Sequence, residues 1–223
     1  MNTQLRATLQ EARQAARCGL LTASEMKLII TPTLKVANND KTRAHLYELL
    51  AQRITGYVEP HYVSDDMLRG QTDEINARGI YAREIAPVEE VGFITNDRWG
   101  FTIGYSPDAL VGDDGLIECK SRRQKYQIET ILADGVPDDY IIQIQTGLLV
   151  SERKWCDFIS YHGGLPMRMI RVTDDPEMQA KIVEAATEFE EKAAELRAEY
   201  DRRLATNPRL IPTERTIEQE MHT

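Results

Sequence analysis

Apolar residues recur every three or four positions over long parts of the chain, and this spacing predicts amphipathic helices. Thr22 and Glu25 have the spacing of a capping box, Gly56 supplies a helix end, and Pro87 stops a later helix. A turn-rich loop is expected at 31–39. Four helices are therefore predicted in the first part of the chain, at 2–17, 22–30, 41–54 and 64–85.

The pattern then changes to short β-rich runs separated by turn signals. The segment Val111–Leu116 reads as a tight hairpin, because Gly115 can take the positive φ that such turns require. Helices are predicted again at 124–133 and 138–151. The predicted strands are 88–95, 99–105, 108–111, 116–120, 154–161 and 166–172.

A long amphipathic helix is predicted at about 175–205, with Pro176 in its first turn. One apolar stripe runs along it, formed by Met178, Ile182, Ala185, Phe189, Ala193, Leu196, Tyr200 and Leu204. The tail that follows is polar and has no clear period.

The order of elements predicts an α/β (α+β) fold, with a central mixed β-sheet flanked by helices and a long C-terminal helix. The length suits one domain over residues 1–223. We expect N-terminal helices within 1–56 and a catalytic core at about 64–172.

Composition indicates a globular protein, with 42% hydrophobic and 28% charged residues. No apolar run approaches the roughly 20 residues needed to span a bilayer, and no signal-peptide core is visible. Cys18, Cys119 and Cys156 lack the spacing of a disulfide framework or a metal site. We expect a soluble protein of the cytoplasm.

The formal net charge of −9 neither supports nor excludes a nucleic-acid partner. Phosphate binding depends on local positive charge, which the net value does not describe. Acidic residues concentrate in 174–200, whereas the segment Lys120–Lys125 is basic.

Three polar residues flank the predicted hairpin: Asp108 opens one strand, and Glu118 and Lys120 end the next. Alternation along a strand places Glu118 and Lys120 on one face and Ile117 and Cys119 on the other. Two converging carboxylates and a backbone carbonyl suit Mg²⁺, and a neighbouring lysine can orient or help deprotonate an attacking water. From the spacing alone, a turn aspartate and a solvated Glu–Lys pair are the commoner interpretation.

The sequence Ser106-Pro107-Asp108, with Glu118-Cys119-Lys120, resembles the PD-(D/E)xK nuclease signature, whose core is restriction-endonuclease-like. More narrowly, it resembles the phage lambda-type 5′→3′ exonucleases of the viral recombinase family. Three more blocks fit in the same order: Arg17–Glu25, with its Thr-Ala-Ser motif; Arg69–Glu74, like the Gly-x-x-x-Glu helix; and Asp139–Gln145, like the Gln helix. Together the blocks cover roughly residues 17–172.

The chain departs from the family pattern in two places. Thr146 and Gly147 follow the Gln helix motif, where the family often carries an aromatic residue. Asp97 matches a further family acid only if one residue is inserted between it and Asp108.

The resemblance implies that Asp108 and Glu118 bind metal together with the Cys119 carbonyl. Lys120 would act on the nucleophilic water. The implied cofactor is Mg²⁺, for which Mn²⁺ can substitute, with one or two ions per subunit.

The resemblance also assigns roles outside this strand pair. Glu74 would hold a metal-bound water or a second ion, and Gln143 would position the lysine, the water or the DNA. Arg17, Ser24 and Ser106 would bind the 5′-phosphate, a dianion for which an arginine fork and small hydroxyls are suitable partners.

The function implied by the resemblance is a Mg²⁺-dependent 5′→3′ double-stranded DNA exonuclease that leaves 3′ single-stranded overhangs. Family members form ring-shaped homotrimers around DNA and pass the overhang to a single-strand annealing protein. A basic channel inside an acidic outer face would reconcile such a ring with the net charge. Two alternatives stay open: a site-specific or structure-specific endonuclease of the same superfamily, and an inert DNA-binding scaffold with the same fold.

Overall fold

A computed structural model describes residues 15–60 and 64–215. Most of the helix predicted over 2–17 lies outside these residues, and within them residues 15–17 are helical. The remaining predicted helices are confirmed to within one residue or so at each end, with one exception. They are α2 (Asp40–Thr55), α3 (Asp65–Glu84), α4 (Gln124–Ala133), α5 (Asp138–Ser151) and α6 (Pro176–Thr206).

Side-chain caps fix the starts of three of these helices. The Asn39 side chain accepts the backbone N–H groups of Lys41 and Thr42 at the start of α2. Ser64 and Asp175 each accept one backbone N–H at the starts of α3 and α6. Such caps satisfy helix N–H groups that have no partner within the helix, and they are visible in the sequence.

The helix predicted over 22–30 is the exception, and that prediction is wrong. The chain forms a two-residue strand, β1 (Leu21–Thr22), and a short 3₁₀ helix, η1 (Met26–Leu28). The Thr22 hydroxyl donates to the Glu25 carboxylate at 2.6 Å, so the pair closes a turn instead of capping a helix. The strand forms because β1 pairs with distant residues 103 and 104, a contact that local spacing does not reveal.

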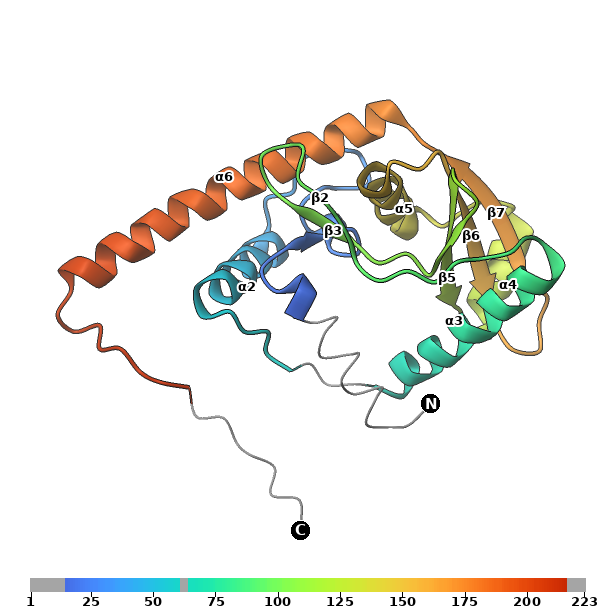
Figure 1. The fold of residues 1–223 in the computed structure, drawn as a ribbon, viewed down its shortest axis with the longest axis horizontal. Coiled ribbons are helices and arrows are strands. Elements are labelled where there is room, and N and C mark those ends of the chain that lie inside the picture. The colour runs from blue at the N-terminus through green and yellow to red at the C-terminus, as the bar shows by residue number, and fades with distance from the viewer. Residues whose placement is uncertain (1–14, 61–63, 216–223) are drawn as a thin grey trace, which may run out of the picture.

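Within the described residues, seven strands form two mixed sheets (Figure 1). The smaller sheet has the order β1, β3 (Ile103–Tyr105) and β2 (Ile94–Asn96). The larger has the order β4 (Ala109–Val111), β5 (Gly115–Ser121), β6 (Trp155–Tyr161) and β7 (Arg168–Thr173). The mixed α/β fold is therefore confirmed, with the strands divided between two sheets.

Two of the predicted strands are shorter than expected. Of the stretch 88–95, only its end lies in β2, while Glu89 makes an isolated bridge to Leu110. Of the stretch 99–105, only the last three residues form β3, because residues 98 and 99 lie in a turn.

Helices cover both faces of the larger sheet. α5 lies between the two sheets, and α3 covers the opposite face of β5 and β6 (Figure 1). Leu116 of β5 belongs to the main buried cluster, whereas Ile117 and Cys119 pack with Ala77 and Tyr81 of α3. The predicted alternation along this strand is confirmed.

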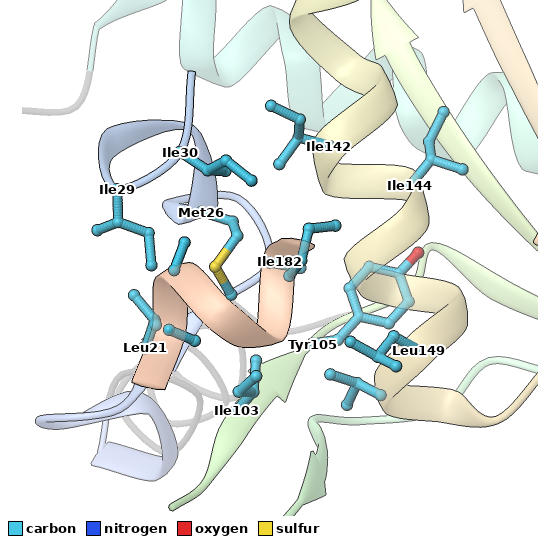
Figure 2. Packing of buried hydrophobic residues seen from close by; sticks show 14 of the residues in the cluster. Leu21, Met26, Ile29, Ile30, Ile103, Tyr105, Ile142, Ile144, Leu149 and Ile182 are labelled. Atoms are coloured by element: carbon cyan, nitrogen blue, oxygen red, sulfur yellow. The ribbon is translucent and has the colours of Figure 1, made fainter. Parts of the chain in front are cut away.

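The main cluster joins β3, α5 and α6 to the segment 21–30, which we call the N-terminal block (Figure 2). Ile182 and Phe189 of α6 are buried in it, but the stripe continues outward to Tyr200 and Leu204, which are 42% and 44% exposed. The end of α6 extends well past the body that its first half covers (Figure 1). No helix among residues 15–60 and 64–215 is long and apolar enough to cross a membrane.

Gly147 of α5 has a packing role that a side chain would disrupt. A Cβ at this position would lie 2.6 Å from Cζ of the buried Tyr105 ring. We expect Gly147→Ala to destabilise the protein by about 1–3 kcal/mol in denaturant unfolding, because the core would be overpacked. The control is Gly79→Ala in α3, where a Cβ meets nothing within 4 Å; it should stabilise by about 0.5–1 kcal/mol. Equal effects of the two substitutions would contradict the packing role.

Candidate active site

Asp108 and Glu118 lie opposite each other at the junction of β4 and β5. The strand register pairs Ala109 with Ile117, so these two acidic residues occupy the next positions outward. The Asp108 N–H donates to the Ile117 carbonyl at 3.3 Å, and the Cys119 N–H donates to the Asp108 carboxylate. One hairpin therefore brings both carboxylates to the same place.

Glu118 is the centre of a hydrogen-bond network, although only 3% of it is exposed. Lys120 Nζ donates to one of its carboxylate oxygens at 2.7 Å, and Gln143 Nε2 donates to the same oxygen. The Tyr105 hydroxyl donates to the other oxygen at 2.8 Å. Lys120 Nζ also lies 3.2 Å from Gln143 Oε1. The helix α5 thus holds Gln143 against both Glu118 and Lys120 of β5.

The carboxyl groups of Asp108 and Glu118 are buried close together, and this changes the pKa values in the site. Burial raises the pKa of Asp108 well above its usual value, and the charges of Glu118 and Glu74 raise it further. Burial alone would lower the pKa of Lys120, but the charge and hydrogen bond of Glu118 outweigh it and raise the pKa. A positive ion beside the carboxylates would offset their repulsion.

The donor atoms suit Mg²⁺. Asp108 and Glu118 offer hard carboxylate oxygens, and this ion takes one or two such ligands while it keeps several waters. Among the residues that the structure describes, no three His, Cys, Asp or Glu side chains gather into a metal-binding group. The two carboxylates would therefore depend on backbone oxygen and water to complete the shell.

Glu74 of α3 lies beside this pair without joining it. Its carboxylate is 3.4 Å from Arg78 Nη1, and the same nitrogen donates to the Asp108 carbonyl at 3.2 Å. Its charge is nonetheless close enough to raise the pKa of Asp108. Arg78 thus links the helix acid to the strand acid.

A cavity of about 180 Å³ brings the two predicted groups of residues together. Arg17, Ser24 and Ser106 line it along with Asp108, Glu118 and Gln143; the other lining residues are Thr22, Ala23, Phe93 and Tyr105. The parallel pairing of β1 with β3 explains this proximity, since it sets the N-terminal block beside the segment that leads to Ser106. The Arg17 guanidinium lies over the Phe93 ring, 5.5 Å from its centre.

The loop after Arg17 is held in place by α2 and α6. Gly19, which has a φ of +70°, donates its N–H to the Gln52 side chain at 2.8 Å. Arg53 donates to the Gly19 carbonyl at 2.7 Å and makes two bonds to Glu190 of α6. The loop that follows Arg17 is therefore fixed by residues far away in the sequence.

A family model for the YqaJ-like viral recombinase domain matches residues 14–154, more than half of the chain. The chain belongs to this family. The matched range of the YqaJ-like domain contains every residue predicted for the site. No curated protein sequence matches the chain significantly.

Solved structures agree with the family. LHK-Exo in complex with dAMP is 33% identical with a TM-score of 0.73, and the match covers 86% of this YqaJ-like chain and 98% of that one. The alkaline exonuclease LHK-Exo from Laribacter hongkongensis is 32% identical with the same coverage and TM-score. A phage-related exonuclease from Haemophilus somnus 129PT, at 16% identity and a TM-score of 0.56 over 81% of this chain and 96% of its own, shares the fold. Family and neighbours together support a nuclease.

One predicted residue of the YqaJ-like domain lies apart from the site. Asp97 is exposed in the turn after β2 and does not line the cavity. Conversely, sequence reasoning missed Tyr105, Arg78 and Phe93. One feature of the sequence could have indicated Tyr105. Gly147 stands near the position where the family often has an aromatic residue, and the Tyr105 ring of β3 occupies the space beside Gly147 instead.

Proposed function

We propose that this YqaJ-like protein is a Mg²⁺-dependent 5′→3′ exonuclease of double-stranded DNA that leaves 3′ single-stranded overhangs. One observation carries the proposal: a single cavity is lined by the acids Asp108 and Glu118 and by the cation and hydroxyls of Arg17, Ser24 and Ser106. The first pair suits phosphodiester chemistry, and the second group suits a terminal phosphate. The chain as a whole would form one nuclease domain.

Asp108, Glu118 and the Cys119 carbonyl would hold the metal, with Mn²⁺ as a substitute and one or two ions per subunit. When bound, Mg²⁺ supplies Lewis acidity at the scissile phosphate. Glu74 would reach the site from α3, through water or a second ion. Its pairing with Arg78 suits a supporting role.

Lys120 and Gln143 would position the attacking water. The raised pKa keeps Lys120 as an ammonium next to Glu118, so it donates hydrogen bonds to the attacking water and to the charge that develops on the phosphate. Gln143 contacts both Lys120 and Glu118, and it thereby fixes their separation. Such fixed positions contribute to catalysis because no reorganisation is needed during the reaction.

The terminal phosphate of the recessed strand would sit with Arg17, Ser24 and Ser106. Because these residues share the cavity with the acids, a bound end would place the first phosphodiester bond near the metal. The complex of LHK-Exo with dAMP supports a family site that accepts a nucleoside monophosphate.

The test is digestion of closed circular duplex beside linear duplex with and without a 5′-phosphate, in Mg²⁺. We expect rapid loss of the phosphorylated linear DNA and an intact circle. Rapid cutting of the circle would favour the endonuclease, and absence of Mg²⁺-dependent activity on every DNA would favour the inert scaffold.

Arg17→Ala should reduce the preference for 5′-phosphorylated ends by about 10–100-fold, the effect of losing one or two charge-assisted hydrogen bonds. The measurement compares initial rates on phosphorylated and hydroxyl ends. Arg83→Ala, an exposed arginine of α3 outside the cavity, is the matched control and should change neither rate. An equal loss on all ends would contradict the assignment of Arg17.

The resemblance to ring-forming exonucleases suggests an assembly for this protein. We propose a homotrimeric ring that works with a single-strand annealing protein in the cytoplasm. The exposed Tyr200 and Leu204 of α6 offer an apolar continuation of the buried stripe for a contact with another copy. A mass measurement in solution tests the trimer.

A further inference from the structure

A second cavity, of about 510 Å³, has charged walls and is not used by the proposed chemistry. Its lining residues come from α3, from the start of α4 and from the loop after β6: Asp66, Arg69, Arg123, Gln124, Lys125 and His162. We call this set the basic patch. It holds three permanent cations and one carboxylate, although the whole chain carries a net charge of −9.

Asp66 organises the two arginines of the basic patch. One carboxylate oxygen accepts from Arg69 Nη1 at 2.9 Å, and the other accepts from Arg123 Nη2 at 2.6 Å. A guanidinium has five N–H donors in a planar fork, so this bridge orients both groups and leaves further donors on each. Two oriented guanidinium groups are a typical partner of phosphate oxygens.

The basic patch contacts the residue that follows the proposed catalytic lysine. Arg69 Nε lies 3.4 Å from Ser121 Oγ, and Ser121 follows Lys120 on β5. Ser121 also donates to Asp73 of α3 at 2.6 Å, which locks the helix to the strand end. The cavity that contains Arg17 includes Glu118 but none of the basic patch residues. Along β5, Lys120 therefore lies between Glu118, which lines the Arg17 cavity, and Ser121, which contacts Arg69 of the basic patch.

An exposed aromatic ring borders the basic patch. Tyr126 is 40% exposed, with Lys125 Nζ 4.6 Å and the Arg122 guanidinium 5.2 Å from its ring centre. Cations interleaved with an aromatic ring are typical of surfaces that bind a nucleic-acid strand, where the cations contact phosphates and the ring packs on sugar or base.

We propose that the basic patch binds backbone phosphates of the cleaved DNA strand on the 3′ side of the cut. The inference rests on the proposed function, which places the 5′ end with Arg17 and the scissile bond at Glu118 and Lys120. A strand that enters there continues past Lys120 towards Arg69, Arg123 and Lys125. The contact holds the substrate through its charge, independent of base sequence.

The first test measures binding of 5′-phosphorylated linear duplex by fluorescence anisotropy in chelator, over a range of salt. Lys125→Ala and Arg123→Ala should each weaken binding and reduce the slope of log K against log salt by about 0.9. Lys181→Ala, an exposed and ion-paired lysine of α6, is the matched control and should keep the wild-type slope. Unchanged slopes in both patch variants would overturn the proposal.

The second test locates the contact along the strand. Neutral methylphosphonates at the second or third linkage from the 5′ end should weaken binding to the wild type, but not to the Arg123→Ala/Lys125→Ala double variant. Equal weakening in both proteins would overturn the proposal. The proposal would also be overturned if the patch variants bound DNA normally but failed to retain an annealing protein. The basic patch would then be a binding surface for a protein and not for DNA. If the wild type digests 5′ ends but the patch variants and the methylphosphonates do not have the expected effects on binding, this inference is wrong and the proposed function stands.

Discussion

Replacing Lys120 with alanine is expected to reduce the rate of Mg²⁺-dependent DNA degradation by about three orders of magnitude. The ammonium of Lys120 lies 2.7 Å from Glu118 and 3.2 Å from Gln143, where it can orient water and stabilise charge on the phosphate. No other lysine contacts Glu118 among the hydrogen bonds of the described residues. The measurement is a single-turnover digestion of phosphorylated linear duplex.

The fold should survive this substitution, because Tyr105 and Gln143 still donate to the buried Glu118 carboxylate. Circular dichroism and thermal unfolding check that point. Lys154→Ala removes a lysine that is 71% exposed and paired with Asp114, and it should retain the wild-type rate. If Lys120→Ala keeps a tenth or more of the wild-type rate, Lys120 is not the group that serves the nucleophile.

Replacing Asp108 with asparagine is expected to reduce degradation by at least about a thousandfold and to stabilise the metal-free protein. Activity falls because an amide is a much weaker Mg²⁺ ligand than a carboxylate. Stability rises because burial, Glu118 and Glu74 raise the pKa of Asp108 in the folded state. Asparagine stays neutral and its side-chain oxygen can still accept the Cys119 N–H.

The same pKa shift sets the direction of the pH dependence. The folded protein binds the Asp108 proton more tightly than the unfolded chain, so the free energy of unfolding falls as the pH rises above the ordinary aspartate value of 3.8. The fall continues until the pH passes the raised pKa. Metal-free wild type should therefore lose thermal stability towards alkaline pH more steeply than Asp108→Asn.

Mg²⁺ should reverse this loss in the wild type, since ligand binding to the folded state alone raises its stability. Melting curves between pH 5 and pH 8, with chelator or with Mg²⁺, measure both effects. Asp97→Asn changes an exposed acid outside the site and should behave like the wild type. A Mg²⁺ response of normal size in Asp108→Asn would contradict the assignment of Asp108 as a ligand.

Sequence patterns predicted the elements whose signals are local. The helices α2, α3 and α6 begin directly after Asn39, Ser64 and Asp175, polar residues whose side chains cap the first turn. The Asp108 and Glu118 pair was predictable for the same reason, because one short hairpin contains both residues.

The features that the sequence did not predict depend on contacts between residues far apart in the chain. Leu21 pairs with Ile103, about eighty residues away, and this contact makes a strand of a segment that has helical spacing. The same pairing completes the small sheet, which is separate from the larger one. Tyr105 is the clearest example of a site residue that the sequence did not predict, because its partners Glu118 and Gly147 lie on other elements. Arg78 reaches Asp108 from α3, again across a distance that spacing does not encode.

We propose above all that this YqaJ-like protein degrades one strand of a duplex from its 5′ end. The most direct measurement is a time course on linear duplex labelled at either the 5′ or the 3′ end of one strand, with Mg²⁺ and a 5′-phosphate. We predict immediate release of the 5′ label as a mononucleotide, a 3′ label that stays on progressively shorter fragments, and no release by Lys120→Ala. Early release of the 3′ label, or 5′-labelled fragments of many lengths, would contradict the claim.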